Sequence, residues 1–279
     1  MSIALYNNNS IACSKITTCN YSSSFSLGIK VLNKKFRNPI YAIYGFVRFA
    51  DEIVDTFYDY NPREELLLFK EQTYKAIQTR FSSNPILHAF QWVVNQFNID
   101  HALIDAFLYS MELDVTKKEY TQEEYKCYIY GSAEAVGLMC LKVFCKGEKQ
   151  LYEKLTPYAR SLGSAFQKVN FLRDIASDNK ERGRVYFPGI TLSNFSWPEK
   201  KVIEKDIKND LHHAYTGIKM LDKDARLGVY MAYSYYKILL HKIEKIDPTK
   251  LLSARYRINN MQKILLIIIC YCKNLLNML

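Results

Sequence analysis

The stretch PIYAIYGFVRFADEIVDTFY, residues 39–58, decides the fold class because it reads as a helix that is apolar around most of its circumference. Its polar side chains are spaced by four, three and four residues, which places them in one narrow stripe along a helix. The stripe consists of Tyr44, Arg48, Asp51 and Asp55. A helix on a protein surface has a broad polar side instead. The stretch therefore predicts a buried helix with two carboxylates and a guanidinium in a line.

A second stretch, PYARSLGSAFQKVNFLRDIASDNK at residues 157–180, has the same design. Its polar stripe is spaced by three, four and four residues, and Arg173 lies directly beside it. The stripe consists of Gln167, Asn170, Asp174 and Asp178. We therefore expect two buried helices that each carry a pair of aspartates.

The rest of the chain predicts an all-α protein. Glycine and proline together make up about 6% of the residues, against roughly 12% in an average protein, and no segment alternates convincingly as a strand does. The best short strand candidate, residues 185–187, is interpreted as a loop. We expect a frayed, Asn/Ser-rich segment at residues 1–20 and a single domain at 21–279. The expected helices are 22–35, 39–58, 63–80, 86–96, 100–114, 121–145, 148–154, 157–180, 198–222, 225–244 and 259–278.

Burial of the aspartates indicates a cation. The spacing alone is weak, because two aspartates four residues apart occur four times, and Asp206 and Asp210 lie among lysines that predict a solvated face. On apolar helices, however, paired carboxylates are costly unless a cation is present. Oxygen ligands favour Mg²⁺ or Mn²⁺, whose coordination shell substrate phosphates would complete, and an internal ion-pair network is the alternative. The arginines expected to bind those phosphates are Arg48, Arg173, Arg182 and Arg184.

Net charge, cysteine spacing and the length of apolar runs limit the classes of binding partner and the cellular compartment. The net charge is +10, and residues 200–279, with fifteen basic and seven acidic side chains, carry most of it. Such a segment allows nucleic acid, an anionic membrane surface or a phosphorylated substrate. The seven cysteines contain no CxxC pair, the first residues lack the pattern of a signal peptide, and the longest apolar run, residues 264–271, is too short to cross a bilayer. We expect a cytoplasmic protein that at most rests on a membrane.

Two segments carry a family resemblance. YAIYGFVRFADEIVD (41–55) and QKVNFLRDIASDNKERGRVYFP (167–188) closely resemble the two signature motifs of the squalene/phytoene synthase family. The resemblance implies the isoprenoid synthase fold, a helical bundle around a central cavity, and it extends over about residues 22–275. Further matches are SSSFSLG (22–28), YIYGSAEAVGLM (128–139), GVYMAYSYY (228–236) and ARYRINNMQK (254–263).

The resemblance also implies a mechanism. Two prenyl diphosphates bind in one cavity, the first loses its diphosphate, and the allylic cation is attacked by the second to give a cyclopropylcarbinyl diphosphate that rearranges to a head-to-head product. By motif position the metal ligands are Asp51, Asp55, Asn170, Asp174 and Asp178. The residues that bind diphosphate or support its metals are Arg48, Gln167, Asn170, Arg173 and Arg184. The residues that shape the site and face the cations are Ser24, Phe25, Tyr44, Tyr128 and Tyr186, and Tyr44 and Arg48 join the four aspartates in the catalytic set.

The substrate has two candidates. The second motif resembles that of the carotenoid branch of the family. This resemblance implies a phytoene synthase that joins two geranylgeranyl diphosphates with Mg²⁺ and without NADPH. The alternative is a squalene or dehydrosqualene synthase that uses farnesyl diphosphate, and more remote alternatives are a non-catalytic relative and a basic interaction protein. Nucleic acid is disfavoured, because the apolar residues between the basic ones at 237–263 keep the spacing of a helical core. The surplus charge at 200–279 favours an anionic membrane face, which an insoluble product must reach.

The small residues between Gly131 and Gly137 leave a choice open. A glycine inside a helix costs about 1 kcal/mol against alanine, so two in one helix require a reason. Room for a long prenyl chain is one reason, and close packing of helices is the other. Within the same motif, Glu134 stands where many relatives have glycine.

Overall fold

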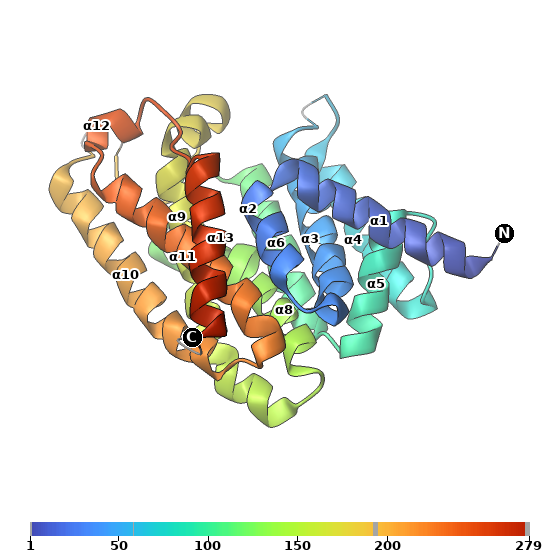
Figure 1. Cartoon of the computed structure of the whole chain (residues 1–279). Coiled ribbons are helices and arrows are strands. Elements are labelled where there is room, and N and C mark those ends of the chain that lie inside the picture. Colours follow the sequence, from blue (N-terminus) through green and yellow to red (C-terminus); the bar gives the residue numbers. More distant parts are fainter. Residues whose placement is uncertain (1, 58, 192–194, 277–279) are drawn as a thin grey trace.

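The computed structural model describes residues 2–57, 59–191 and 195–276, and every regular element among them is a helix (Figure 1). The predicted all-α fold is confirmed. The candidate strand at residues 185–187 is a loop that makes one isolated bridge, between Val185 and Glu119. The last residues of the expected helices 39–58 and 259–278 lie outside the described part.

The described residues form the following helices along the chain. The helices are α1 (Ile3–Tyr21), α2 (Ser23–Val31), α3 (Lys34–Asp55), α4 (Pro62–Thr79), α5 (Pro85–Phe97), α6 (His101–Thr116), α7 (Gln122–Ile129), the π-helix η1 (Tyr130–Ala135), α8 (Val136–Cys145), α9 (Lys149–Arg182), α10 (Trp197–Met220), α11 (Lys223–Glu244), α12 (Pro248–Leu251) and α13 (Asn260–Leu275).

The prediction of a frayed N-terminus was wrong. Residues 3–21 form α1, which packs against α3 and α5. Its buried face consists of Ser10, Ser14 and Thr18, whose hydroxyls donate to carbonyls one turn earlier in the same helix. Small residues at this spacing let the helix approach closely, and Ser14 lies against Gly45 of α3. The polar composition of the segment concealed this packing face, because hydroxyls that bond to their own helix can be buried at little cost.

Two prolines that were expected to separate helices lie inside them instead. Residues 148–154 and 157–180 form one helix, α9, which runs through Pro157. In the same way α3 begins at Lys34, five residues before Pro39, because the Asn33 side chain caps its first turn. A proline inside a helix costs about 3 kcal/mol. The packing of α9 against α8, η1 and α10 outweighs that cost. The helix that holds the second stripe therefore extends back through Pro157 to Lys149.

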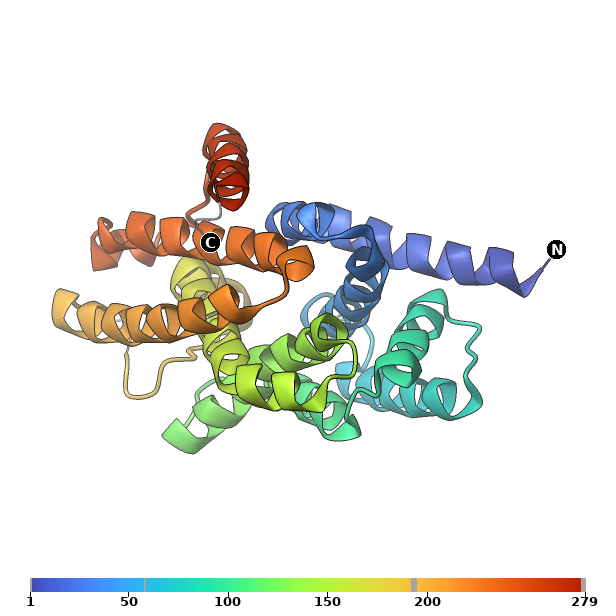
Figure 2. The same ribbon diagram turned by 60° about the horizontal axis from the view of Figure 1, so that its bottom comes forward.

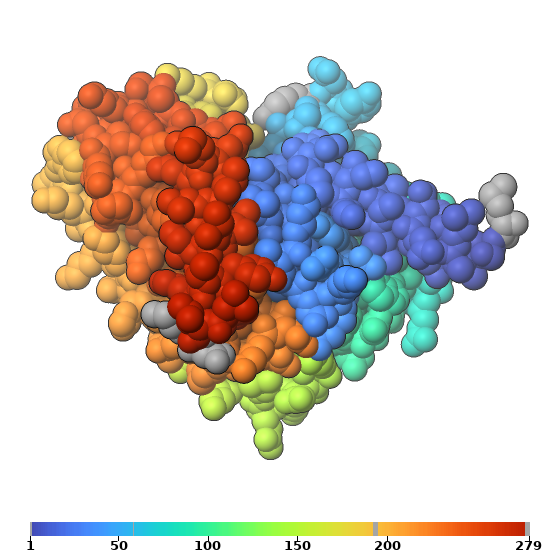
Figure 3. Space-filling view, viewed as in Figure 1, coloured from blue at the N-terminus to red at the C-terminus, as the bar shows by residue number. Residues whose placement is uncertain are grey.

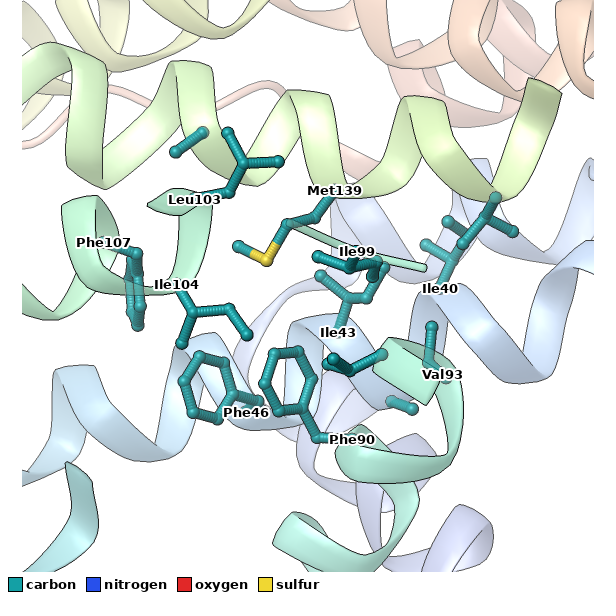
Figure 4. Close-up of a cluster of buried hydrophobic side chains, with 14 of the residues drawn as sticks. Ile40, Ile43, Phe46, Phe90, Val93, Ile99, Leu103, Ile104, Phe107 and Met139 are labelled. Atoms are coloured by element: carbon teal, nitrogen blue, oxygen red, sulfur yellow. The ribbon is translucent and has the colours of Figure 1, made fainter. Parts of the chain in front are cut away.

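The core around α3 fixes the position of the first stripe (Figure 4). Phe46 of α3 stacks on Phe90 of α5 with 3.8 Å between ring centroids, and Ile104 and Met139 close the cluster from α6 and α8. Ile43 and Phe46 are both almost completely buried. Because they occupy one side of α3, the polar stripe on the other side is held toward the interior between α3 and α9.

The glycines at 131 and 137 answer the question that the sequence left open. Gly131 lies in η1, where a Cβ atom would come within 2.1 Å of the Ala106 carbonyl oxygen of α6, so its role is close helix packing. Gly137 lines the cavity described below, so it provides room there. Glu134 lines no part of that cavity, and its carboxylate accepts a hydrogen bond of 2.5 Å from Arg160 of α9. Both explanations therefore apply, each to one glycine.

Replacing Gly131 with alanine is expected to lower the free energy of unfolding by about 3 kcal/mol, because the new methyl group must displace the backbone of α6. Urea unfolding followed by circular dichroism measures this. The matched control is Gly137→Ala, whose Cβ would lie 3.3 Å from the nearest atom, the Ala159 carbonyl oxygen, and whose unfolding free energy should change by less than about 1 kcal/mol. Equal values for the two variants would contradict the packing role of Gly131.

Candidate active site

A cavity of about 1240 Å³ lies between the helices and collects nearly all of the predicted site residues. Its size exceeds the roughly 300–1,000 Å³ of a pocket for one drug-sized ligand. Arg184 is the one predicted residue that does not line the cavity. Its guanidinium nevertheless donates a hydrogen bond of 2.8 Å to the carboxylate of Asp55, which does line it. The predicted residues that line the cavity are Ser24, Phe25, Tyr44, Arg48, Asp51, Asp55, Tyr128, Gln167, Asn170, Arg173, Asp174, Asp178 and Tyr186.

The two aspartate pairs face one another across the polar end of this cavity. Asp51 and Asp55 are on the last turns of α3, and Asp174 and Asp178 are on α9. Arg182 joins the pairs: its guanidinium nitrogens lie 3.2 Å from the Asp55 carboxylate and 2.9 Å from the Asp178 carboxylate. Residues 123 positions apart along the chain thus form one acidic site.

Arginines form ion pairs with the carboxylates of the acidic site. Arg48 pairs with Asp51 and with Glu52 of its own helix. Arg173 and Arg255 both contact Asp174, at 2.5 Å and 2.7 Å. Arg255 was missed as a site residue, although it belongs to the segment 254–263 that matched the family. The ion-pair network considered from the sequence is therefore present.

The arginines do not fully compensate the carboxylates. Burial, and then the neighbouring Asp55 charge, raises the pKa of Asp51 to about 7. Burial, and then the neighbouring Asp174 charge, raises the pKa of Asp178 to about 7 as well. Each shift means that the surroundings disfavour the charged carboxylate. The site thus has room for further positive charge, which fits an oxygen-liganded divalent cation.

No ready-made metal cage accompanies these carboxylates. Within the described ranges, no three Asp, Glu, His or Cys side chains converge closely enough to hold a metal ion. Mg²⁺ usually takes only one or two carboxylates and completes its shell with water and substrate phosphate. The donor set therefore fits Mg²⁺ whose coordination shell is completed by a diphosphate.

Asp114 of α6 organises the back of the site and was missed by the sequence analysis. Its buried carboxylate accepts hydrogen bonds from the hydroxyls of Tyr128 (2.7 Å), Tyr186 (3.0 Å) and Tyr120 (3.2 Å). Arg184 lies 3.6 Å from the same carboxylate and donates to the Asp114 carbonyl oxygen at 2.8 Å. A signal existed in the sequence, because Asp114 falls on the apolar face of its helix, seven residues after a buried phenylalanine.

The hydroxyls of Tyr128 and Tyr186 therefore point at Asp114 in this structure. The Tyr186 ring stacks on Phe171 with 4.1 Å between centroids, and the rings of both tyrosines line the cavity. Tyr120 also stacks on Tyr186, with 5.3 Å between ring centroids, so the ring of Tyr186 is held by two aromatic neighbours.

A second group of rings lies at the α2 side of the cavity. Phe25 packs against Tyr44 with 5.5 Å between centroids, and Phe166 stacks on Tyr236 with 4.0 Å between centroids. The Tyr236 hydroxyl donates to the Asn170 amide oxygen at 3.2 Å and so fixes the side chain of a predicted ligand. Phe166 and Tyr236 were not predicted as site residues, although Tyr236 lies in the matched segment 228–236.

Beyond the rings, the cavity wall is apolar and free of charged side chains. This part lies between α6, α8 and the first half of α9, far along the helices from the aspartates. Apolar side chains make up nearly all of this end, which suits a long hydrocarbon chain. The residues of this end are Phe107, Met111, Val136, Gly137, Cys140, Leu141, Phe144, Leu155, Tyr158 and Leu162.

Comparison with known proteins agrees with this geometry. Residues 19–262 match the family described as squalene/phytoene synthase, which is most of the chain. The chain belongs to the squalene/phytoene synthase family. The resemblance inferred from the two motifs is thus confirmed, and the protein is a prenyltransferase of that family.

Relatives in the squalene/phytoene synthase family are named for different activities. Phytoene synthase of Arthrospira platensis is 28% identical over 84% of this chain and 83% of its own length. The 4,4'-diapophytoene synthase of Staphylococcus haemolyticus is 26% identical over 81% of this chain and 85% of its own length. A crystal structure of a dehydrosqualene synthase in complex with a ligand has the same fold, with a TM-score of 0.79, 20% identity and coverage of 95% of this chain and 96% of that one.

Proposed function

We propose that the protein joins two geranylgeranyl diphosphates head to head to give phytoene and diphosphate, with Mg²⁺ and without NADPH. The observation that carries the proposal is the pairing of two facing aspartate pairs with a long apolar cavity. The polar end suits diphosphate and its metal ions, and the apolar end suits prenyl chains. The family match supports head-to-head condensation. The chain length of the substrate is proposed, at 28% identity to a phytoene synthase.

Metal ions would be held by the two aspartate pairs, with Asn170 beside the second pair. Bound there, Mg²⁺ would supply charge that stabilises the departing diphosphate. The chain's own cations do the same work from the sides, since Arg173 and Arg255 already lie against Asp174 and would bind diphosphate oxygens. A diphosphate with its metal ions would replace some of the ion pairs that the arginines make with the aspartates.

The aromatic residues would protect and stabilise the cation that forms next. Rings of Phe25, Tyr44 and Tyr186 line the cavity near the aspartates. Cation–π attraction is worth roughly 0.5–2 kcal/mol per ring, and the apolar wall keeps water away from the reactive carbon. These residues thus favour attack by the second prenyl double bond over quenching by water.

Farnesyl diphosphate is the second candidate substrate, because diapophytoene and dehydrosqualene synthases are among the similar proteins. Purified protein should be incubated with each diphosphate and Mg²⁺, with and without NADPH, and the hydrocarbon identified by mass spectrometry. We expect phytoene from geranylgeranyl diphosphate, unchanged by NADPH. A product formed only from farnesyl diphosphate would contradict the phytoene proposal and keep the head-to-head reaction.

A cytoplasmic location is part of the proposal. By length and composition, one described stretch, Gln122–Cys145, could cross a membrane, but it is the core segment α7–η1–α8, in contact with α6 and α9. Contact with a membrane is then a matter of the protein surface.

A further inference from the structure

Helix α13 has its apolar side turned toward solvent. Only Leu266 and Cys270 are buried, against α11, and the helix stands on the outside of the bundle (Figure 2). Its only charged residues in the described part, Lys263 and Lys273, donate inward to Ser23 of α2 and to the Tyr230 hydroxyl of α11. The apolar outer side, called here the α13 face, consists of Met261, Ile264, Leu265, Ile268, Ile269, Tyr271, Leu275 and Leu276, each more than two-fifths exposed.

A solvated helix has the opposite arrangement, with charges outside and apolar residues inside. The α13 face is contiguous and uncharged, and large exposed apolar patches of this kind mark interaction sites. Single exposed leucines elsewhere on the surface need no such explanation.

The two end segments of the sequence carry only positive charges. Residues 248–279 contain five basic side chains and no acidic one, and residues 1–50 contain six basic side chains and no acidic one. Together these two ends hold eleven positive charges, whereas the segment between them has a net charge of −1. The whole basic character of the protein is thus carried by its two ends.

The fold brings these two ends to one side of the molecule. Figure 3 shows α13 beside the N-terminal helices on one face. Leu27 of α2 meets Leu266 and Ile267 across a small crevice. Lys30 follows Leu27 by one turn on α2 and is exposed, and Lys250 is exposed on α12, ten residues before α13 begins. The α13 face therefore has an exposed basic side chain, Lys30, on the helix beside it.

The cavity extends to the start of α13. Lys263, at the start of α13, and Arg257, just before it, both line the cavity that holds the aspartates.

We propose that the α13 face is a membrane-docking surface that inserts into the headgroup region of a bilayer rich in anionic phospholipid. The helix Asn260–Leu275 is about 24 Å long, too short to span a bilayer, and one side of it is fixed to α11. It therefore lies in the plane of the interface, with its apolar side in the lipid and the exposed Lys30 on the phosphates. The location fits the proposed function, but docking does not depend on that function.

A second copy of the chain is a less suitable occupant. Pairing two α13 faces about a twofold axis would bring the same basic residues of both copies together, and like charges oppose such an association. An anionic lipid surface complements both the apolar and the basic part of the face.

The test is cosedimentation of the full chain, without substrate, with vesicles of phosphatidylcholine alone and of phosphatidylcholine mixed with phosphatidylglycerol. We expect binding to the mixed vesicles and weaker binding to the neutral ones. The double variant Ile264→Gln/Ile268→Gln should bind the mixed vesicles about tenfold more weakly. Lys30→Gln should weaken binding to the mixed vesicles about fivefold and leave the neutral ones unchanged.

The matched control is Leu67→Gln/Val202→Gln, which removes two similarly exposed apolar side chains from α4 and α10 and should bind as the parent does. Circular dichroism verifies that both double variants keep their helices. The proposal would be overturned if the parent protein bound neither vesicle type. It would also be overturned if the double α13 variant bound the mixed vesicles as strongly as the parent does. A dimer in sedimentation velocity that this variant converts to a monomer would overturn it as well, since a second copy would then cover the face. Because no turnover is measured, a failed activity assay would not affect the result.

Discussion

Replacing Asp51 with asparagine is expected to lower kcat on the order of 1,000-fold. The amide keeps the size of the carboxylate but removes a negative charge from the α3 pair, where a metal ion with its diphosphate would bind. The fold should not lose stability, because burial already disfavours the charged carboxylate and raises its pKa to about 7. Initial rates of diphosphate release at saturating Mg²⁺ measure the loss, and Asp174→Asn should behave alike.

The chain supplies a matched control for this experiment. Asp206 belongs to another pair of aspartates four residues apart, on α10, and its carboxylate accepts from Lys168 at 2.5 Å on the outside of the bundle. Asp210 also accepts from Lys168, at 2.7 Å, so Asp206→Asn leaves that lysine with a partner. The control should keep its activity. If Asp51→Asn turned over as fast as Asp206→Asn does, the assignment of the aspartate pairs to metal binding would be wrong.

Replacing Asp114 with alanine is expected to remove about 3–5 kcal/mol from the free energy of unfolding. The change strips three buried tyrosine hydroxyls of an acceptor and leaves Arg184 with Asp55 as its one remaining carboxylate within salt-bridge distance. Since single domains have about 5–15 kcal/mol in total, this loss would be visible as a much lower midpoint in urea. Asp114→Asn should lose less, because the amide oxygen still accepts hydrogen bonds.

The control for Asp114 is on the same helix. Asp105 accepts from the Tyr74 hydroxyl at 2.7 Å, but its side chain is 55% exposed. Asp105→Ala therefore removes a tyrosine–aspartate bond where water can replace it, and it should cost less than about 1 kcal/mol. If the two alanine variants lost the same stability, Asp114 would not be the buried centre of the site.

The sequence was most informative where polar residues interrupt an apolar helix. The two stripes on α3 and α9 were predicted because carboxylates on such helices need an explanation, and the cavity contains both stripes. Asp114 was missed because a single aspartate near a helix end is usually solvated, and only the fold brings Tyr120, Tyr128 and Tyr186 to it. Arg255 was missed for the same reason, since its partner Asp174 is far away in the sequence.

Errors in the fold came from reading local composition alone. α1 is rich in Asn and Ser, yet its buried face of Ser10, Ser14 and Thr18 packs closely on α3. A search for periodic apolar residues does not detect such a face. Pro157 separates two helices by local preference, and packing against the neighbouring helices keeps them as one. In both cases contacts between distant segments outweigh a local preference.

A crystal structure with a non-reactive thio analogue of geranylgeranyl diphosphate and Mn²⁺ tests the central claim most directly, because anomalous scattering locates the metal. We expect metal between the diphosphate and the carboxylates of Asp51, Asp55, Asp174 and Asp178, with Arg173 and Arg255 on the diphosphate and the prenyl chain along the apolar end of the cavity. Diphosphate held by the arginines alone, with no metal at either aspartate pair, would contradict the account.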